Sequence, residues 1–440
     1  PRRLGTMSRR RPLLFIVLFV WLFAPAHALA VLTIEITGGM EAGMPVAVVP
    51  FEWRGQGAPP VDIRSVIAAD LHRSGRFEIL PVEDFLSRPS DHREVRYKDW
   101  RLIKAEALVV GQMKALGGNR FEVRFQLFDV FQKKQLAGHR WEVEGARLRK
   151  VAHQASDHIV KALIGKGPAF DSRIAYVTVE NVASKGPTYR LMVADSDGFS
   201  PREILLSSDP ILSPAWSPDG RYLAYVSFED GWSKVLVQEI DSGNRVKMSE
   251  YLGINSAPAW SPDGRQLALS LSHEGNSEIY VMDIKSRRLQ RLTHHSAIDT
   301  EPAWTPNGQS LIFTSDRSGR PQIYRIPTAG GKAVRLTFEG RENSRASISL
   351  DGKNLLMVTS NGNGHQIGVF SISNKRLRTL TSGPLDESPT FAPNGSMALY
   401  ATKRGGRELL EVVSADGRAR QALRFQQGAV HSPAWSPVNR

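Results

Sequence analysis

Four carboxylates are the first candidates for chemistry in this sequence of 440 residues, because they form two closely spaced pairs. Asp299 and Glu301 lie two residues apart, and Asp386 and Glu387 are neighbours further along the chain. Two carboxyl groups that face each other can divide the roles of acid and base, as in glycoside cleavage. The spacing alone does not place these groups opposite one another. One hypothesis is therefore an enzyme, or a receptor for a glycan or another small ligand.

The common catalytic motifs do not occur in the sequence. A serine hydrolase would need the pentapeptide G-x-S-x-G on a separate α/β domain, and the chain contains no such pentapeptide. HExxH, which marks many zinc proteases, and GxGxxG, which marks dinucleotide binding, are also missing. We therefore expect a protein without catalytic residues and without a cofactor. A peptidase regulator that lost its catalytic domain remains a third hypothesis.

The histidines and the acidic turns offer weak metal-binding patterns. His153 and His158 are five residues apart, which is a poor spacing for two ligands on one helix, and His294 and His295 fall in a polar turn. We interpret all four as surface histidines. The stretch Asp195–Gly198 lacks the other acidic positions of a calcium loop and is interpreted as a turn. No metal site is expected.

The first thirty residues resemble a secretory signal peptide. Three arginines precede the apolar run LLFIVLFVWLF at 13–23, and small residues follow it before Val31. This run is short for a membrane span, so a retained anchor is the weaker alternative. The chain has no cysteine, which excludes disulfides, thiolate metal sites and a lipidated cysteine. We expect cleavage after residue 30 and a periplasmic location.

The charge of the chain gives no sign of nucleic-acid binding. Five of the 57 basic residues lie in the signal peptide, so 52 basic residues face 44 acidic residues in the mature chain. This excess is spread evenly over the sequence. A nucleic-acid-binding surface would concentrate basic residues in one segment.

A repeat of about 44 residues organises most of the chain. Its marker is the triplet PAW or a relative of it, followed by a turn such as SPDG and by runs with alternating apolar residues. Successive markers are separated by 44, 44, 44, 43 and 44 residues, at Trp216, Trp260, Trp304, Ile348, Phe391 and Trp435. Four short strands in each unit are typical of a β-propeller blade. We expect the marker aromatics to pack between blades.

The two ends of the repeat region favour a closed propeller over an open solenoid. The last unit supplies only its first strand, and the first unit lacks that strand. Pairing 432–437 with 173–179 would complete the first blade and close a ring with six blades. Ring closure removes the exposed sheet edges that an open array would leave. We therefore predict a six-bladed all-β propeller at 173–440.

The residues before the propeller lack the repeat and predict a mixed α/β domain at 31–165. A strand is expected at Met44 to Trp53, a helix at Val61 to Gly75, and a closing amphipathic helix that ends near Gly165. The linker at 166–172 is short, so we expect the two domains to touch.

The loops ahead of the inner strands differ between repeats, although the scaffold does not. These segments read SDPILS, GINSA, AIDTE, RENSR, PLDES and GAVHS, and they should surround one mouth of the central channel. Packing demands are equal in every blade, whereas contacts with one asymmetric partner are not. The variation therefore indicates a docking surface. The alternative is that these loops are merely solvated.

Several segments together resemble the TolB family, the periplasmic component of the Tol-Pal cell-envelope system. They are MPVAVVPFEW, EALVVGQM, RIAYVTVE, EPAWTPNGQSLIFTSDRSGRPQIYRI and SPAWSP, in this order along the mature chain. The resemblance implies a monomeric protein that binds other proteins and catalyses nothing. Its partners would be the peptidoglycan-associated lipoprotein Pal and the C-terminal domain of TolA. Its role would be in outer-membrane integrity and in envelope constriction during cell division.

The resemblance also implies binding residues. By position, the Pal-binding residues at the propeller mouth are Ile254, Ala257, Thr300 and Glu301. The repeat geometry adds four neighbours, Arg345, Asp386, Glu387 and His431. Family members often have a histidine where this chain has Ile254. The TolA-binding segment would be 31–43, where apolar residues alternate with polar ones in a pattern that suits strand addition to a sheet edge; its named residues are Val31, Leu32, Ile34 and Ile36.

Overall fold

The computed structural model describes residues 43–182, 186–423 and 428–438. All of these residues belong to one compact unit. The expected signal peptide at 1–30 and residues 31–42 of the expected TolA-binding segment lie outside the described residues. No helix in the described part of the chain is long and apolar enough to cross a membrane.

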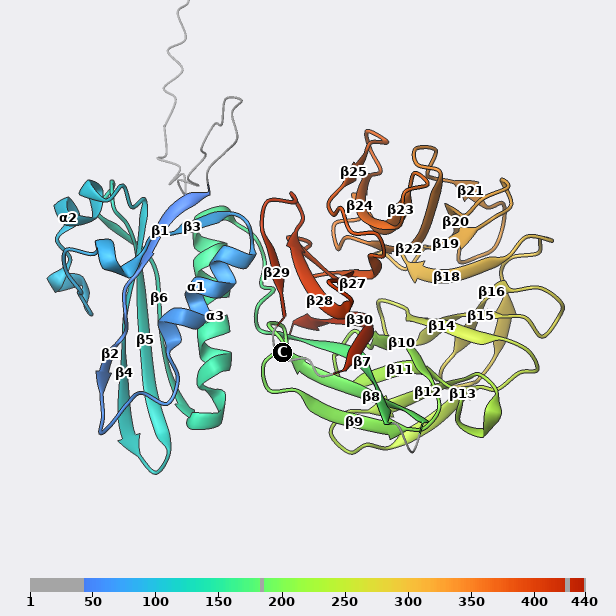
Figure 1. Cartoon of the computed structure of the whole chain (residues 1–440), viewed down its shortest axis with the longest axis horizontal. Coiled ribbons are helices and arrows are strands. Elements are labelled where there is room, and N and C mark those ends of the chain that lie inside the picture. Colours follow the sequence, from blue (N-terminus) through green and yellow to red (C-terminus); the bar gives the residue numbers. More distant parts are fainter. Residues whose placement is uncertain (1–42, 183–185, 424–427, 439–440) are drawn as a thin grey trace, which may run out of the picture. The chain divides into compact units, whose positions relative to one another are not determined.

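The region before the propeller is a mixed sheet with helices (Figure 1). The strands follow the order β3-β1-β4-β5-β6, and β2 pairs with β4. The strands are β1 (Met44–Val48), β2 (Glu52–Arg54), β3 (Phe77–Ile79), β4 (Ala107–Gly117), β5 (Arg120–Asp129) and β6 (Lys134–Glu144). The helices are α1 (Ile63–Arg73), α2 (Tyr97–Leu102) and α3 (Leu148–Ile164), with 3-10 turns at Val82–Asp84, His92–Glu94 and Gly145–Arg147.

Local sequence explains where these elements begin and end. The carboxylate of Asp62 accepts a hydrogen bond from the backbone N–H of Ser65 and caps the start of α1. Gly165 has a φ of 67° and ends α3, as its sequence predicts. The single strand expected at 44–53 is wrong, because β1 and β2 are separate strands with Pro50 between them. Proline has no backbone N–H to donate to the neighbouring strand.

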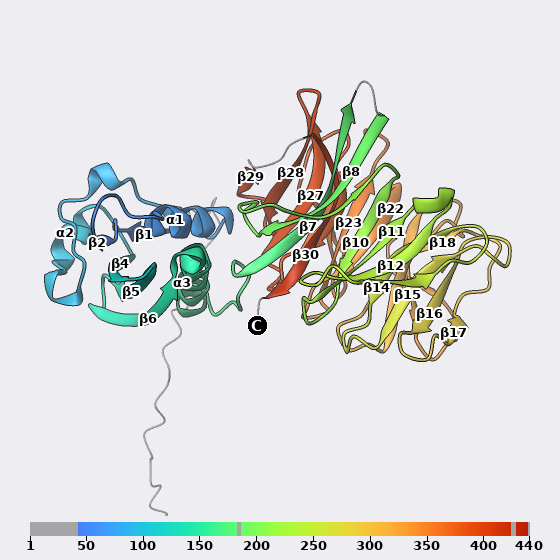
Figure 2. The ribbon, with the colours of Figure 1, turned by 90° about the horizontal axis from the view of Figure 1, so that it is seen from below.

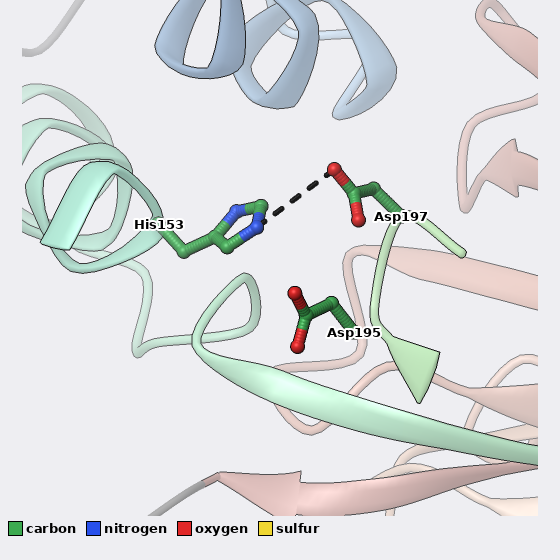
Figure 3. Close-up of side chains that lie close together, drawn as sticks. All are labelled: His153, Asp195 and Asp197. Carbon is green, nitrogen blue, oxygen red and sulfur yellow. Dashed lines mark ion pairs between the residues drawn. The ribbon is translucent and has the colours of Figure 1, made fainter. Parts of the chain in front are cut away.

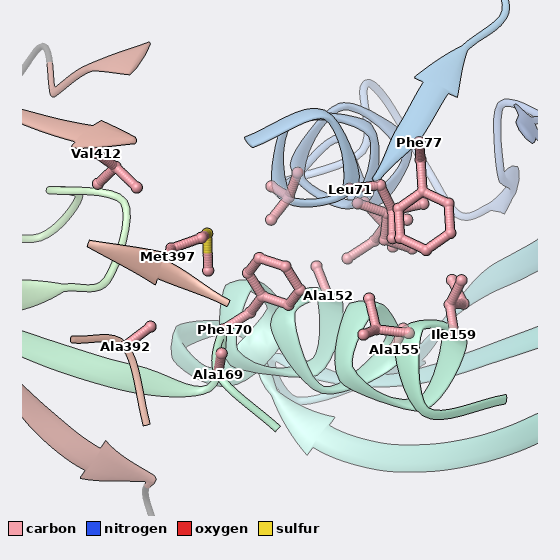
Figure 4. Packing of buried hydrophobic residues seen from close by; sticks show 14 of the residues in the cluster. Leu71, Phe77, Ala152, Ala155, Ile159, Ala169, Phe170, Ala392, Met397 and Val412 are labelled. Carbon is pink, nitrogen blue, oxygen red and sulfur yellow. The ribbon is translucent and has the colours of Figure 1, made fainter. Parts of the chain in front are cut away.

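One apolar cluster contains residues of both the α/β region and the propeller. Figure 4 shows Leu71 of α1 and Ala152 of α3 in the same cluster as Phe170 of the linker and Met397 of β27 (Met397–Arg404). Phe170 is 1% exposed and Met397 is fully buried. The two regions therefore share a core, in agreement with the contact expected from the short linker.

The propeller consists of six four-stranded antiparallel sheets (Figures 1 and 2). In ring order, the first three sheets are β30 (Ala429–Val438), β7 (Ser172–Val182), β8 (Gly186–Asp195) and β9 (Arg202–Ser207); β10 (Ile211–Trp216), β11 (Tyr222–Ser227), β12 (Lys234–Glu239) and β13 (Arg245–Ser249); and β14 (Asn255–Trp260), β15 (Gln266–Leu271), β16 (Glu278–Asp283) and β17 (Leu289–Arg291). The last three are β18 (Asp299–Trp304), β19 (Ser310–Ser315), β20 (Gln322–Pro327) and β21 (Val334–Arg335); β22 (Glu342–Ile348), β23 (Asn354–Ser360), β24 (Gln366–Ser371) and β25 (Leu377–Thr379); and β26 (Glu387–Phe391), β27, β28 (Arg407–Ser414) and β29 (Arg420–Ala422). A 3-10 turn at Glu229–Gly231 lies between β11 and β12.

The C-terminal strand closes the ring. β30 pairs antiparallel with β7, and its register runs from Ala429 opposite Val179 to Val438 opposite Ser172. Trp435 lies opposite Ile174 in this pairing. The predicted fold class, an α/β region followed by a six-bladed propeller closed by the last strand, is therefore confirmed.

The marker tryptophans connect neighbouring blades in two ways. Trp216, Trp260 and Trp304 each donate a hydrogen bond from Nε1 to the alanine carbonyl of the preceding PAW triplet, over 3.1, 3.1 and 3.0 Å. Trp216 and Trp304 are also 92% buried, with 8% of their surface exposed. A hydrogen bond of this kind stabilises by about 0.5–1.5 kcal/mol beyond the apolar burial. The packing role expected for these residues is confirmed.

Candidate functional site

The first strands of the six blades surround a central cavity of about 190 Å³. Each strand contributes a dipeptide that ends in proline, or in alanine in one blade. The dipeptides are Ser213-Pro214, Ala257-Pro258, Glu301-Pro302, Arg345-Ala346, Ser388-Pro389 and Ser432-Pro433. The first residue of every dipeptide has a positive φ, between 48° and 55°, and the strand pairing shifts its register there. Such bulges re-aim side chains, and here they line the channel.

An ion pair between two blades supplies the charge in this channel. Glu301 and Arg345 are the charged side chains that line the cavity among the described residues. Nε of Arg345 lies 2.8 Å from Oε1 of Glu301, and the backbone N–H of Arg345 donates to Oε2 over 2.9 Å. Thr314 also donates to Oε2, and Arg345 donates to the hydroxyl of Ser388. Glu301 is therefore occupied as an acceptor rather than free to act as a base.

The residues that precede the marker residue differ in exposure according to their position in the repeat, so each position is described by its distance from the marker. The third residue back lines the channel, and this group contains Ala257, Glu301 and Arg345. The fourth residue back is Thr300, Glu387 or His431 in three of the blades. Of these, Glu387 is exposed and the other two are half-buried.

The fifth residue back from the marker is buried in every blade, and Asp386 occupies this position. Its equivalents Asn255, Asp299 and Asn343 are fully buried as well. Asp386 accepts hydrogen bonds from the hydroxyl of Thr402 and the backbone N–H of Gly383. We therefore revise our prediction for Asp386, which stabilises its own loop and offers no surface to a partner.

The sixth residue back is apolar and exposed in three blades. Ile254, Ile298 and Leu385 are 51%, 54% and 54% exposed. Leu252 beside Ile254 is 89% exposed. Ile254 is among the predicted site residues, whereas the sequence analysis did not name the other three. An alignment of the repeats could have identified Ile298 and Leu385, because they occupy the same repeat position as Ile254. We name Ile254, Ile298 and Leu385 the apolar rim.

A second cavity of about 420 Å³ adjoins the channel on one side. Arg345, Glu387 and His431 line it together with apolar residues that include Leu212 and Leu385. Burial lowers the pKa of His431, and the positive charge of Arg345 acts in the same direction. The structure thus brings three predicted residues together at one side of the mouth, with Arg345 lining both cavities.

The four carboxylates do not form a catalytic pair. Asp299 is buried and forms an ion pair with Arg317 over 2.6 Å, and burial raises the pKa of its carboxyl group. Asp386 is buried in another blade, and Glu301 is paired with Arg345. Glu387 is exposed to solvent, and Glu301 is half-buried. This arrangement gives no support to acid and base catalysis in the channel.

One of the four histidine interpretations is wrong. His153 is only 3% exposed, because its face of α3 packs against α1 and the propeller, and its Nδ1 lies 2.8 Å from a carboxylate oxygen of Asp70. His158, His294 and His295 are exposed, as predicted. The turn expected at Asp195–Gly198 is confirmed, since the N–H of Gly198 donates to the carbonyl of Asp195.

Comparisons with known proteins agree over nearly the whole chain. Family models match the TolB amino-terminal domain at residues 32–136 and the TolB beta propeller domain at residues 160–439. The Tol-Pal system protein TolB of Nitrosococcus oceani is 60% identical over 422 residues, which cover 96% of this chain and 97% of that protein. The protein of the same name from Thioalkalivibrio sulfidiphilus is 58% identical, with the same coverage. The crystal structure of TolB from Acinetobacter baumannii is 39% identical, has a TM-score of 0.83, and covers 90% of this chain and 97% of its own.

Proposed function

The chain belongs to the TolB family of Tol-Pal system proteins, and we propose that it acts in the periplasm by binding Pal at the propeller mouth and TolA through residues 31–43. The family consists of non-catalytic components of the cell envelope. The function is therefore binding, and the enzyme hypothesis is not needed.

The asymmetric mouth on a repeated scaffold is the observation that carries the Pal proposal. Six equivalent bulges line the channel, but only two of them present charges, Glu301 and Arg345. The apolar rim interrupts the polar surface in three of the six blades. A docking surface combines apolar contacts with a few fixed polar groups, and solvated loops have no need of either.

The apolar rim also accounts for Ile254. A histidine at this position would offer a polar contact, whereas isoleucine offers an apolar one. Ile298 and Leu385 at the same repeat position have the same character. In this protein we expect the rim to contact an apolar patch of the partner, and the ion pair of Glu301 and Arg345 to face polar groups of the partner at the centre.

The TolA proposal depends on the sequence of 31–43. Leu32, Ile34 and Ile36 would lie on one face of an extended segment, since side chains alternate along a strand. Such a segment can add to the edge of a partner's sheet, where main-chain hydrogen bonds provide affinity and the apolar face provides specificity. The signal-peptide pattern in the sequence of 1–30 supports the proposed periplasmic location.

Calorimetric titration of residues 31–440 with the soluble domain of Pal from the same organism tests the Pal proposal. We expect binding in a one-to-one ratio. The variant Thr300→Arg should abolish it, because a long charged side chain would enter the interface. Ser373→Arg is the matched control, since Ser373 is exposed in the turn between β24 and β25, at the end of the ring away from the mouth. The absence of binding heat at several temperatures, or unimpaired binding by Thr300→Arg, would contradict the proposal.

A further inference from the structure

A buried cluster of charged residues joins the α/β region to the first propeller blade. His153 on α3 points towards Asp195 and Asp197, which lie at the end of β8 and in the turn that follows it (Figure 3). Nε2 of His153 lies 3.8 Å from a carboxylate oxygen of Asp197. On the other side of the ring, Nδ1 lies 2.8 Å from Oδ2 of Asp70 on α1.

Two arginines complete the cluster. Arg73 on α1 pairs with Asp70 over 2.7 Å, and it also donates to the carbonyl of Ser196 in the turn after β8 over 3.4 Å. Arg149 on α3 pairs with Asp197 and stacks on the ring of Phe199, 3.8 Å from the ring centroid. Apart from the Asp70–Arg73 pair within α1, every link runs between a helix of the α/β region and the first blade, or between the two helices.

With all three carboxyl groups of the cluster ionised, its formal charges balance only when His153 is protonated, although burial raises the pKa of Asp195. Asp70, Asp195 and Asp197 supply three negative charges, whereas Arg73 and Arg149 supply two positive charges. His153 and Asp70 are almost fully buried, and an uncompensated buried charge is costly. A proton on His153 supplies the missing positive charge.

The position of Nε2 points to the same protonation state. This atom is buried and has no hydrogen-bond partner among the described residues. If Nδ1 donates to Asp70 and His153 is neutral, Nε2 presents a lone pair towards the carboxylates of Asp195 and Asp197. A proton on Nε2 reverses the sign of this interaction and makes it attractive.

A metal ion fits the same place less well. His153, Asp195 and Asp197 offer three ligand atoms within 4.8 Å of one another. However, Arg149 already pairs with Asp197, and Arg73 lies beside Asp70. A divalent cation would add two positive charges next to two guanidinium groups, whereas the cluster requires only one. We therefore do not assign a metal site.

We propose that protonated His153 is a latch that holds the α/β region against the first propeller blade, and that loss of its proton weakens this contact. The groups that face it are Asp70 and Arg73 from α1, Asp195 and Asp197 from the first blade, and Arg149 from its own helix. Asp157, one turn further along α3, is occupied by the backbone N–H groups of 169–171. The latch is independent of the partners proposed above.

The sign of the pH dependence follows from these neighbours. Burial lowers the pKa of His153, but the carboxylates of Asp70 and Asp197 outweigh burial and raise it above 6.5. A histidine with a raised pKa stabilises the folded protein fully below the pKa of the unfolded chain, and the stabilisation is lost as pH rises through the folded pKa. The latch is thus closed below pH 6.5 and weakens as pH rises through the raised pKa of His153 in the folded protein.

The test uses residues 31–440 without any partner. Two-dimensional NMR of ring-labelled histidine should show that His153 titrates above 6.5. Hydrogen exchange at residues 196–200, corrected for intrinsic rates, should be about three- to tenfold faster at a pH above the His153 pKa found in this titration than at pH 6. His153→Gln should show fast exchange at both pH values. His158→Gln should behave like the unmodified protein, because His158 lies on the same helix but is exposed.

Three outcomes would overturn the latch. One is a His153 ring that is already neutral at pH 6, which the NMR titration of the unmodified protein decides even if the glutamine variant fails to fold. Another is exchange in His153→Gln with the pH dependence of the unmodified protein. The third is a rise in Tm on adding Zn²⁺ that requires His153, since this would assign the cluster to a metal ion instead of a proton.

Discussion

Removing the apolar rim should weaken Pal binding strongly and leave the fold intact. Full burial of an isoleucine or leucine side chain contributes about 1.5–3 kcal/mol. Because each rim residue is about half exposed in the free protein, covering it contributes about 0.8–1.6 kcal/mol. The triple variant of Ile254, Ile298 and Leu385 to alanine should therefore lose about 2–4 kcal/mol, after allowing for the alanine methyl groups, or about 30- to 1,000-fold in Kd.

The assay is calorimetric titration with the soluble domain of Pal, and Leu350→Ala is the control. Leu350 is 75% exposed, but it follows β22 at the end of the ring away from the mouth. The control should bind with unchanged Kd. Leu350→Ala should shift the free energy of unfolding by no more than about 0.5 kcal/mol, because its side chain is largely exposed. The triple variant should lose about 2–4 kcal/mol of this free energy and still fold, because about half of each rim side chain is buried in the free protein. An unchanged Kd in the triple variant, or an equal loss in the control, would refute a role of the rim in docking.

Three further predictions concern the ion pair, the blade contacts and the mouth histidine. Glu301→Gln should lower the free energy of unfolding by about 1–3 kcal/mol, measured in urea, because Arg345 loses a half-buried ionic partner; an unchanged midpoint would show that the pair is dispensable. Trp216→Phe should cost about 1–3 kcal/mol in the same assay, because the carbonyl of Ala434 loses its donor, and unchanged stability would contradict this role. The pKa of His431 lies below 6.5, so its folded form binds protons less well than the unfolded chain and stability should fall as pH drops below 6.5. Thermal unfolding of His431→Gln should lack this component, and an identical pH profile would disprove it.

The repeat made the propeller predictable because its spacing is set by packing that every blade shares. Trp216, Trp260 and Trp304 recur at one interval since each must reach the carbonyl of the preceding blade. The incomplete units at the two ends of the repeat region predicted that the last strand closes the ring. The break at Pro50 was missed because the apolar pattern continues across it, although the hydrogen-bonding capacity of the backbone does not.

The site was less predictable than the propeller. The position of a residue in the repeat predicts which loop contains it, but not whether its side chain points into the protein or into solvent. Asp386 and Glu387 are neighbours, yet one is buried and the other is exposed. Comparison across repeats could have separated them, because the position of Asp386 holds Asp or Asn in three other blades, where it is also buried. His153 was misjudged for another reason. Its burial depends on α1 and on a turn of the propeller, and both are distant in the sequence.

The residues at equivalent positions of the mouth differ between blades. The places where they differ most indicate where a partner makes its strongest contacts. The first residue of the channel dipeptide is serine or alanine in four of the six blades, and these blades are nearly equivalent at the channel wall. Arg345 breaks this equivalence, and the second cavity beside it collects Leu212, Leu385, Glu387 and His431. A partner centred on the channel axis would meet mostly small neutral side chains. A partner displaced towards the second cavity would meet charged and apolar groups together. Because specificity requires contacts that differ from their surroundings, the side of the ring where the last blade meets the first should add distinctive contacts to those proposed for Thr300 and the apolar rim.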